Sequence, residues 1–149
     1  MIERENIVKD KSYKFALRIV NLYKFLTDAN KEYVLSKQIL RCGTSIGANI
    51  EESIGCSTKK DFVNKISIAY RESRETRYWL NLLFDAKYIE KKIYESLIAD
   101  CDELIKLTGK IISSSKKAID NWIAGVAQLV EQLIRNQQVA GSNPVTSSY

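Results

Sequence analysis

The amino-acid sequence predicts an all-α protein, an up-down antiparallel four-helix bundle. Its single proline, Pro144, lies near the C-terminus, so no proline interrupts a helix earlier in the chain. Lysine, glutamate, isoleucine, leucine and alanine are frequent and there are only 6 glycines, a composition that favours helices over strands. Apolar residues recur every three or four positions through four segments, and the short connections between them make successive helices antiparallel.

The four expected helices follow from the stripes of apolar residues. We expect helices over residues 12–28 and 31–55, a third that begins after the N-cap Ser57-Thr58 and ends near residue 86, and a fourth over residues 90–117. Spacings near 3.5 residues are typical of knobs-into-holes packing with shallow crossing angles. The stripes consist of Phe15, Ile19, Leu22 and Leu26; Leu35, Ile39, Cys42, Ile46 and Asn49; Phe62, Ile66, Ala69, Ser73, Thr76, Leu80 and Leu83; and Ile93, Leu97, Leu104, Leu107 and Ile111.

A second set of apolar residues flanks these stripes. One bundle core needs about three apolar positions in seven, and this chain offers more. The surplus predicts either a wide core or a second face buried between subunits, and the pattern leaves both open. The flanking set consists of Leu17, Val20, Val34, Val63, Tyr70, Ile98 and Ile105.

The composition divides the chain into a bundle domain over residues 1–119 and a C-terminal tail over residues 120–149, for which we expect little regular structure. Residues 124–148 contain no lysine, whereas residues 1–120 are rich in lysine. One interpretation of the tail is a short amphipathic helix, Val126 to Ile134, that docks on the bundle.

Back-translation of the tail supports another, compatible interpretation. Codons for Val126 to Glu131 can be written to resemble the D-arm of a transfer RNA gene, and codons for Gly141 to Pro144 to resemble its T-arm. Between them, codons for Leu133 to Gln137 can begin with CTGATT and end with its reverse complement, AATCAG, as an anticodon arm requires. The tail therefore resembles read-through of an adjacent transfer RNA gene.

Charge and cysteine content limit the environment of the chain. The net charge is +5, from 23 basic and 18 acidic residues, and the excess lies in residues 1–120. This bias is compatible with an RNA or DNA partner and also occurs in many soluble helical proteins. The three cysteines, Cys42, Cys56 and Cys101, form no CxxC pair. Without an export signal or an apolar run of about 20 residues, we expect reduced thiols, a cytoplasmic location and no membrane partner.

The chemistry of most enzymes is missing, and we predict a non-enzymatic protein without cofactor or metal. There is no histidine, which excludes Ser-His and Cys-His nucleophile pairs and the Glu-x-x-His ligands of di-iron bundles. There is no glycine-rich phosphate loop. The adjacent carboxylates Glu51-Glu52 and Asp102-Glu103 point about 100° apart on a helix, so neither pair forms a two-carboxylate site.

The third segment contains the candidate nucleic-acid-binding residues. Arginines recur every third residue with Tyr70, Tyr78 and Trp79 between them, a pattern suited to phosphate contacts and base stacking. The alternative is that Glu72 and Glu75 pair with these arginines and that the aromatic rings pack at the bundle margin. The candidates are Lys59, Lys60, Lys65, Arg71, Arg74 and Arg77.

Three stretches, FALRIVNLYKFL, LSKQILRCGTSIGANIEES and FVNKISIAYRESRETRYWLNLL, resemble the S23 or 23S rRNA intervening-sequence protein family. The resemblance covers about residues 8–118. Two positions depart from the family pattern: Gly47 stands where proline is common and Ser53 where glycine is common, so the second helix should be less kinked and its end less sharply defined. The most specific matches are Gln38, Arg41, Ser45, Ile46, Asn49, Ile50, Glu52 and Glu75.

The resemblance implies an up-down bundle that assembles into a ring-shaped homopentamer. It also implies kinship with the accessory variability protein of diversity-generating retroelements, a basic pentameric barrel that binds nucleic acid and a reverse transcriptase. The expected function is that of a non-enzymatic oligomeric bundle that binds RNA or DNA, as an accessory to an RNA or a retroelement, with a reverse transcriptase as a further partner. The alternative is a protein-interaction scaffold that does not bind nucleic acid.

The second segment combines small and polar residues in a way that predicts close helix packing. Gly43, Gly47 and Ala48 allow a neighbouring helix to approach, and Arg41 and Glu75 are candidates for a bridge between the second and third helices. We interpret the polar residues as a clasp that fixes helix register and subunit packing, although a direct nucleic-acid contact stays open for Arg41. The clasp residues are Gln38, Arg41, Ser45, Asn49, Glu52 and Glu75.

Overall fold

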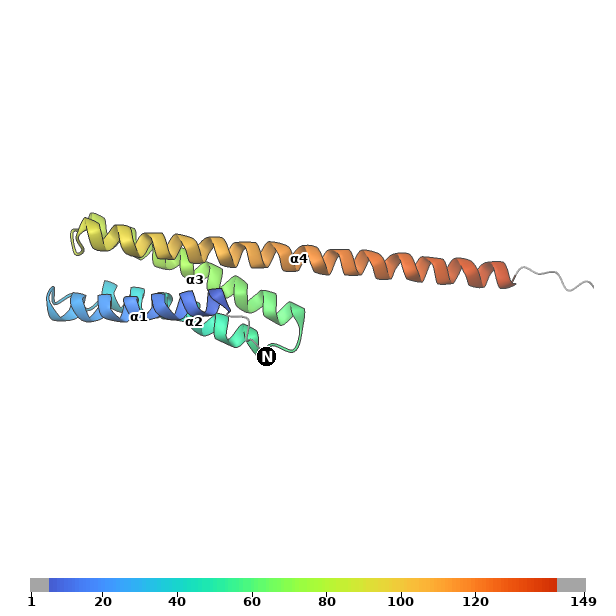
Figure 1. The fold of residues 1–149 in the computed structure, drawn as a ribbon, viewed down its shortest axis with the longest axis horizontal. Coiled ribbons are helices and arrows are strands. Elements are labelled where there is room, and N and C mark those ends of the chain that lie inside the picture. The colour runs from blue at the N-terminus through green and yellow to red at the C-terminus, as the bar shows by residue number, and fades with distance from the viewer. Residues whose placement is uncertain (1–5, 142–149) are drawn as a thin grey trace, which may run out of the picture. The chain divides into compact units, whose positions relative to one another are not determined.

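The computed structural model describes residues 6–141, with side chains to residue 136, and contains no strand in that range. Its helices are α1 (Ile7–Asp28), α2 (Leu35–Ile54), α3 (Lys59–Asp85) and α4 (Lys91–Gly141) (Figure 1). The chain divides into two compact units, one up to Ser114 and one from Ser115. Within the described range no helix is long and apolar enough to cross a membrane.

The first unit is an up-down four-helix bundle, which confirms the predicted fold class. Helix α2 contacts both α1 and α3. Polar contacts join the first part of α4 to its two neighbours: Arg18 of α1 donates to Ser96 Oγ at 2.7 Å, and Arg77 of α3 pairs with Asp102 at 3.3 Å. Each helix therefore contacts two others around one core.

The predicted stripes form the core of this bundle, with a few departures at its ends. On α1, all four predicted residues from Phe15 to Leu26 are buried. Ile89, in the connection before α4, is buried as well. The predicted stripe residues that are only partly buried or exposed are Leu35, Asn49, Phe62, Ile93, Leu107 and Ile111.

Buried hydroxyl groups explain how polar residues occupy core positions. Ser73 Oγ donates to the carbonyl oxygen of Ala69 at 2.8 Å, and Thr108 Oγ1 donates to that of Leu104 at 2.7 Å. Because each of these hydroxyls bonds a backbone carbonyl three or four residues earlier in the chain, none of them is left unsatisfied and none needs a partner helix. The buried polar residues with this type of bond are Ser12, Ser36, Ser53, Ser73, Thr76 and Thr108.

Two buried thiols lie in the same interior. Thr76 Oγ1, whose proton goes to the carbonyl oxygen of Glu72, lies 3.2 Å from Cys42 Sγ, and Cys101 Sγ donates to the carbonyl oxygen of Ser73 at 3.2 Å. Burial raises the pKa of Cys42 to about 11 and that of Cys101 to about 12. Both groups therefore stay protonated near neutral pH and serve as packing groups rather than nucleophiles.

The N-cap of α3 was predicted from the sequence, whereas the cap of α2 was not. Thr58 Oγ1 accepts a hydrogen bond from the backbone N–H of Asp61 at 3.1 Å, so the predicted N-cap of α3 is confirmed. Helix α2 begins at Leu35, later than expected, because Glu32 is nearly buried and caps it with its carboxylate. The carboxylate accepts from the backbone N–H groups of Val34, Leu35 and Ser36 at 2.9, 2.8 and 2.6 Å.

The connection after α3 closes on a non-glycine residue in a left-handed conformation. Lys87 has φ 64°, its N–H donates to the carbonyl oxygen of Phe84, and the N–H of Tyr88 donates to that of Leu83, each at 2.9 Å. These two hydrogen bonds form a Schellman motif. Lys87 holds its left-handed position, which glycine adopts with the least strain.

We expect Lys87→Gly to raise the free energy of unfolding by about 0.5–1 kcal/mol, because relief of left-handed strain exceeds the added freedom of the unfolded chain. Lys106→Gly is the matched control, since the same substitution at an exposed position in the interior of α4 should destabilise by about 0.5–1 kcal/mol. Chemical denaturation at one protein concentration measures both. Equal effects of the two variants would contradict the strain argument.

The second unit departs from the sequence prediction. Its boundary follows residue 114 rather than 119, and residues 120–141 are helical where little regular structure was expected. Helix is possible here because residues 115–141 contain no proline and, apart from Gly125 and Gly141, no residue that strongly disfavours helix. Every side chain from residue 120 to 136 is exposed.

Candidate nucleic-acid interface

One face of α3 carries basic side chains without any carboxylate. Helix α3 buries Ile66, Ala69, Ser73, Thr76, Leu80 and Leu83, and residues about half a turn away face outward. The outward residues recur at spacings of four and three, and we name them the outer stripe. The outer stripe consists of Lys60, Asn64, Ser67, Arg71, Arg74 and Tyr78.

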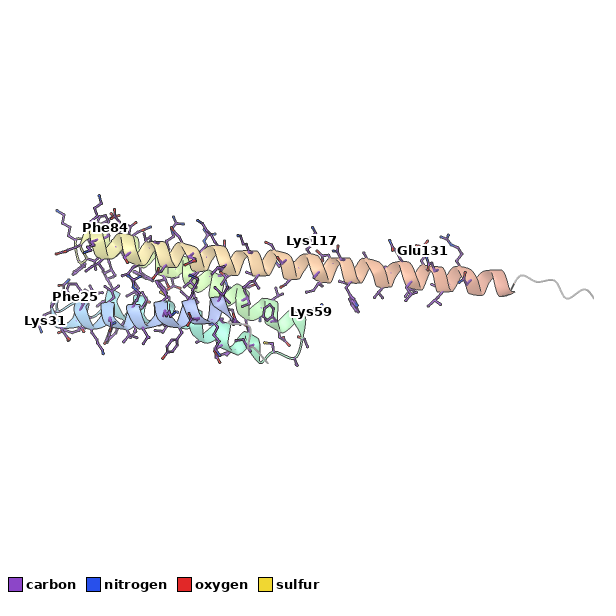
Figure 2. The ribbon with its side chains drawn as sticks, in the orientation of Figure 1. Phe25, Lys31, Lys59, Phe84, Lys117 and Glu131 are labelled. Atoms are coloured by element: carbon purple, nitrogen blue, oxygen red, sulfur yellow. The ribbon has the colours of Figure 1, made fainter. Side chains whose placement is uncertain are left out.

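The structure separates the six predicted basic residues into two groups. Lys59, which marks the start of α3 in Figure 2, and Lys60, Arg71 and Arg74 are exposed and have no carboxylate within ion-pair distance among the described side chains. Arg74 keeps its charge available although its guanidinium lies 5.8 Å from the centre of the Tyr70 ring.

The other two cations are engaged by carboxylates of neighbouring helices. Lys65 pairs with Glu52 of α2, whose hydrogen bond raises the pKa of the ammonium, and Arg77 pairs with Asp102 of α4 at 3.3 Å. Their charges are therefore largely compensated, and the unpaired group is the better candidate for phosphate contacts.

The acidic residues between the arginines do not pair with them. Arg41 of α2 donates a hydrogen bond from Nη2 to Glu75. The other terminal nitrogen of Arg41, Nη1, lies 3.5 Å from Glu72 Oε2. That oxygen is buried and has no hydrogen-bond donor in the described part of the chain, so the nearby guanidinium compensates its charge. The alternative in which Glu72 and Glu75 pair with the arginines of their own helix therefore does not hold, and the outer stripe stays basic.

The aromatic residues of α3 differ in what they contact. Trp79 Nε1 donates to Glu75 Oε1 at 3.2 Å, and Tyr70 lies against Gly109 of α4, so both pack at the bundle margin. Tyr78 meets the edge of Trp79 with ring centres 5.0 Å apart and is 58% exposed. Tyr78 is the aromatic ring of this group that is available for stacking.

The predicted polar clasp is made of separate contacts rather than one network. The bridge from Arg41 to Glu75 is present, and Glu52 adds a second link from α2 to α3 through Lys65. Asn49 is half-buried and bonds its own helix, with Nδ2 donating to the carbonyl oxygen and hydroxyl of Ser45 at 2.8 and 3.1 Å. Gln38 is exposed, and no hydrogen bond of its side chain occurs among the described residues.

The small residues of α2 allow α1 to pack closely against it, as predicted. A methyl group added at Gly43 would lie 2.8 Å from both γ carbons of Ile19, and one at Gly47 would lie 3.4 Å from the backbone oxygen of Ser12. Above this contact the two helices form an open groove of about 1040 Å³. The groove was not anticipated, and its lining includes Tyr13, Ala16, Thr44, Gly47, Ala48 and Ile54.

No metal centre is apparent in the described residues, where no three histidine, cysteine, aspartate or glutamate side chains come close enough to hold an ion. The buried thiols lie apart from the outer stripe, on the opposite side of α3. The arrangement that the structure offers is therefore a surface with unpaired cations, an exposed tyrosine and a separate apolar groove.

Comparisons with known proteins place the chain in a family. The profile of the 23S rRNA-intervening sequence protein family matches residues 4–110. The crystal structure of a protein of unknown function from the S23 ribosomal protein family of Bacteroides thetaiotaomicron is 56% identical. That match covers 70% of this chain and 97% of that chain with a TM-score of 0.70. A comparison with curated proteins finds no match. The chain therefore belongs to the 23S rRNA-intervening sequence protein family.

Proposed function

We propose that this chain is a non-enzymatic, oligomeric helical bundle that binds the phosphate backbone of RNA or DNA, in the cytoplasm, through the outer stripe of α3 and the adjoining Lys59 at the start of that helix. The observation that carries the proposal is the group of four unpaired cations, Lys59, Lys60, Arg71 and Arg74, beside the exposed ring of Tyr78. Cations of this kind position a protein on phosphates, and an exposed ring stacks on unpaired bases without sequence preference.

Oligomerisation makes this weak charge effective. A single copy carries only +5, whereas the homopentamer implied by the family resemblance would carry about +25 on a shared surface. Exposed apolar residues on the outer side of α1 and α2 support contact between copies. Tyr13 is 65% exposed, Leu17 49% and Ile54 51%, and two of them border the groove between these helices.

Fluorescence anisotropy with labelled single-stranded RNA and duplex DNA tests the proposal. We expect binding at about 50 mM salt that weakens by about two orders of magnitude at about 200 mM, because four phosphate contacts on duplex DNA correspond to a salt slope of about 3.6. Absence of binding at the lower salt would reject nucleic-acid binding altogether.

A matched pair of double variants tests the named residues. Arg71→Gln with Arg74→Gln removes two unpaired charges, and Lys65→Gln with Arg77→Gln removes two paired charges. We expect the first variant to lose at least about tenfold in affinity and the second less than about threefold, since each lost phosphate contact also lowers the salt slope. Equal losses would assign binding to net charge rather than to the outer stripe.

A protein-interaction scaffold is the second candidate, and the apolar groove between α1 and α2 favours it. The groove is lined by small and apolar side chains, among them exposed Tyr13 and Ile54, together with the charged residues Lys9, Asp10 and Glu51, which suits an amphipathic helix from another protein. A reverse transcriptase is the protein partner that the family resemblance implies. Loss of partner binding in Ala48→Glu, with nucleic-acid binding retained, would separate this role from the outer stripe.

A further inference from the structure

The part of α4 in the second unit has an uncovered apolar face. Seven large apolar side chains between residues 122 and 134 are 40% to 67% exposed. About half of each side chain meets solvent, which leaves on the order of 600 Å² of apolar surface, at the upper end of what a monomer usually exposes. The seven residues are Trp122, Ile123, Val126, Leu129, Val130, Leu133 and Ile134.

These apolar residues have the heptad spacing of helices that pack against one another in coiled coils and bundles. Ile119, Trp122, Val126, Leu129 and Leu133 follow one another at intervals of three and four, the a and d positions of a heptad. Ile123 and Val130 occupy the adjoining e positions. An apolar face of three positions in seven is wider than the seam of a two-stranded coiled coil and suits a bundle of several helices.

The charged residues of this segment lie on the opposite side. Glu131 and Arg135 fall at the outward f and c positions of the same heptad, and Asp120 shares the flanking b position with Ile134. Arg135 bonds Glu131 of its own helix at 2.8 Å (Glu131 is labelled in Figure 2). Neighbouring identical helices would therefore bring no like charges together at their seam.

The low positive charge of this segment argues against a membrane or a nucleic acid as its partner. Helices that lie on anionic membranes, and surfaces that bind nucleic acid, carry clustered lysine and arginine, whereas Arg135 is the only cation between residues 118 and 149. A face that is apolar, weakly charged and complementary to itself is best buried against its own copies. About 600 Å² per copy approaches the roughly 800 Å² per partner of a stable interface.

We propose that residues 115–136 of several copies of this chain associate through this face as a short helical bundle. The association does not depend on nucleic-acid binding. It also does not depend on how the segment arose, since the resemblance to a transfer RNA gene concerns origin and not physical behaviour.

The fluorescence of Trp122 in the full-length chain tests this association. In a Trp79→Phe chain, Trp122 is the only tryptophan, so its emission reports burial of this face alone. We expect blue-shifted emission that moves toward the position of the unfolded chain on dilution. Leu129→Glu should abolish the blue shift, whereas Ala124→Glu, at an outward position, should preserve it.

Cross-linking between copies distinguishes association from docking within one chain. In a Cys56→Ser background the remaining natural thiols are buried, so a single new thiol decides the product. With oxidised glutathione as the oxidant that accepts the two electrons, we expect Leu129→Cys to form disulfide-linked dimers severalfold faster than Ala124→Cys. Emission typical of an exposed tryptophan at all concentrations, or a blue shift without preferential cross-linking of Leu129→Cys, would overturn the proposal.

Discussion

Replacement of Gly43 by alanine is expected to lower the free energy of unfolding by about 2–3 kcal/mol. The added methyl group would lie 2.8 Å from Ile19 Cγ1 and Cγ2, and Ile19 is completely buried. Because a β-branched side chain on a helix has essentially one rotamer, Ile19 has no means to turn away, and α1 must shift from α2. The clash outweighs the roughly 1 kcal/mol by which alanine usually stabilises a helix over glycine.

Two further variants isolate this steric cause. In Gly109→Ala, the methyl group would lie 3.5 Å from the Tyr70 ring, an ordinary contact, so stability should stay equal or rise. Combining Gly43→Ala with Ile19→Ala removes both γ carbons, and the double variant should lose less stability than the sum of the single variants. Strict additivity in chemical denaturation would contradict a direct clash.

Substitution of Glu32 by alanine is expected to cost about 2–3 kcal/mol of stability, because it leaves three backbone N–H groups at the start of α2 without their acceptor. The side chain is only 9% exposed, so water replaces the carboxylate poorly. Chemical denaturation measures the loss, and Glu90→Ala, an exposed glutamate just before α4, is a suitable control with a small expected effect.

The contribution of Glu32 should depend on pH. Burial by itself raises the pKa of Glu32, but hydrogen bonds from the backbone N–H groups of Leu35, Ser36 and Val34 outweigh it and hold the pKa below its ordinary value of 4.5. A carboxyl group with a lowered pKa in the folded state adds stability above the pKa of the unfolded chain and loses it as pH falls through the folded value.

We therefore expect the difference in stability between wild type and Glu32→Gln to be constant near neutral pH and to shrink below about pH 4.5. Denaturation curves from about pH 7 to 3 measure this difference. A difference that stays constant over the whole range would show that the charge of Glu32 has no part in the cap.

The sequence predicted the bundle because its main determinants are local. Residues from Phe15 to Leu26 on α1 and from Ile66 to Leu83 on α3 repeat at helix spacing, and an apolar stripe has one favourable outcome, burial against the other stripes. The N-cap at Thr58 was equally local, since the cap and the N–H that it accepts from lie three residues apart. The family could also be recognised from motifs within single helices.

Most charge pairs between helices could not be predicted from the sequence. On the sequence alone, six cations of α3 had equal roles, but Lys65 lies on the edge that faces Glu52, and Arg77 on the edge that faces Asp102. Pairing of Glu72 with the arginines of its own helix was an open alternative, whereas in the structure Arg41 of α2 lies beside it. Two side chains at the correct spacing for a pair within one helix choose the neighbouring helix when packing places an opposite charge there.

By itself, the sequence determined that this protein is helical, the approximate course of α1 to α3 and of the first part of α4, most of the core residues, and the absence of histidine chemistry. Only the tertiary structure decided which cations are free on the outer stripe and that Glu32, rather than a residue next to α2, caps that helix. It also decided that the small residues of α2 accommodate α1. The physical reason is range: helix formation and amphipathic burial depend on residues within one or two turns, whereas charge pairing depends on the register between helices far apart in the chain.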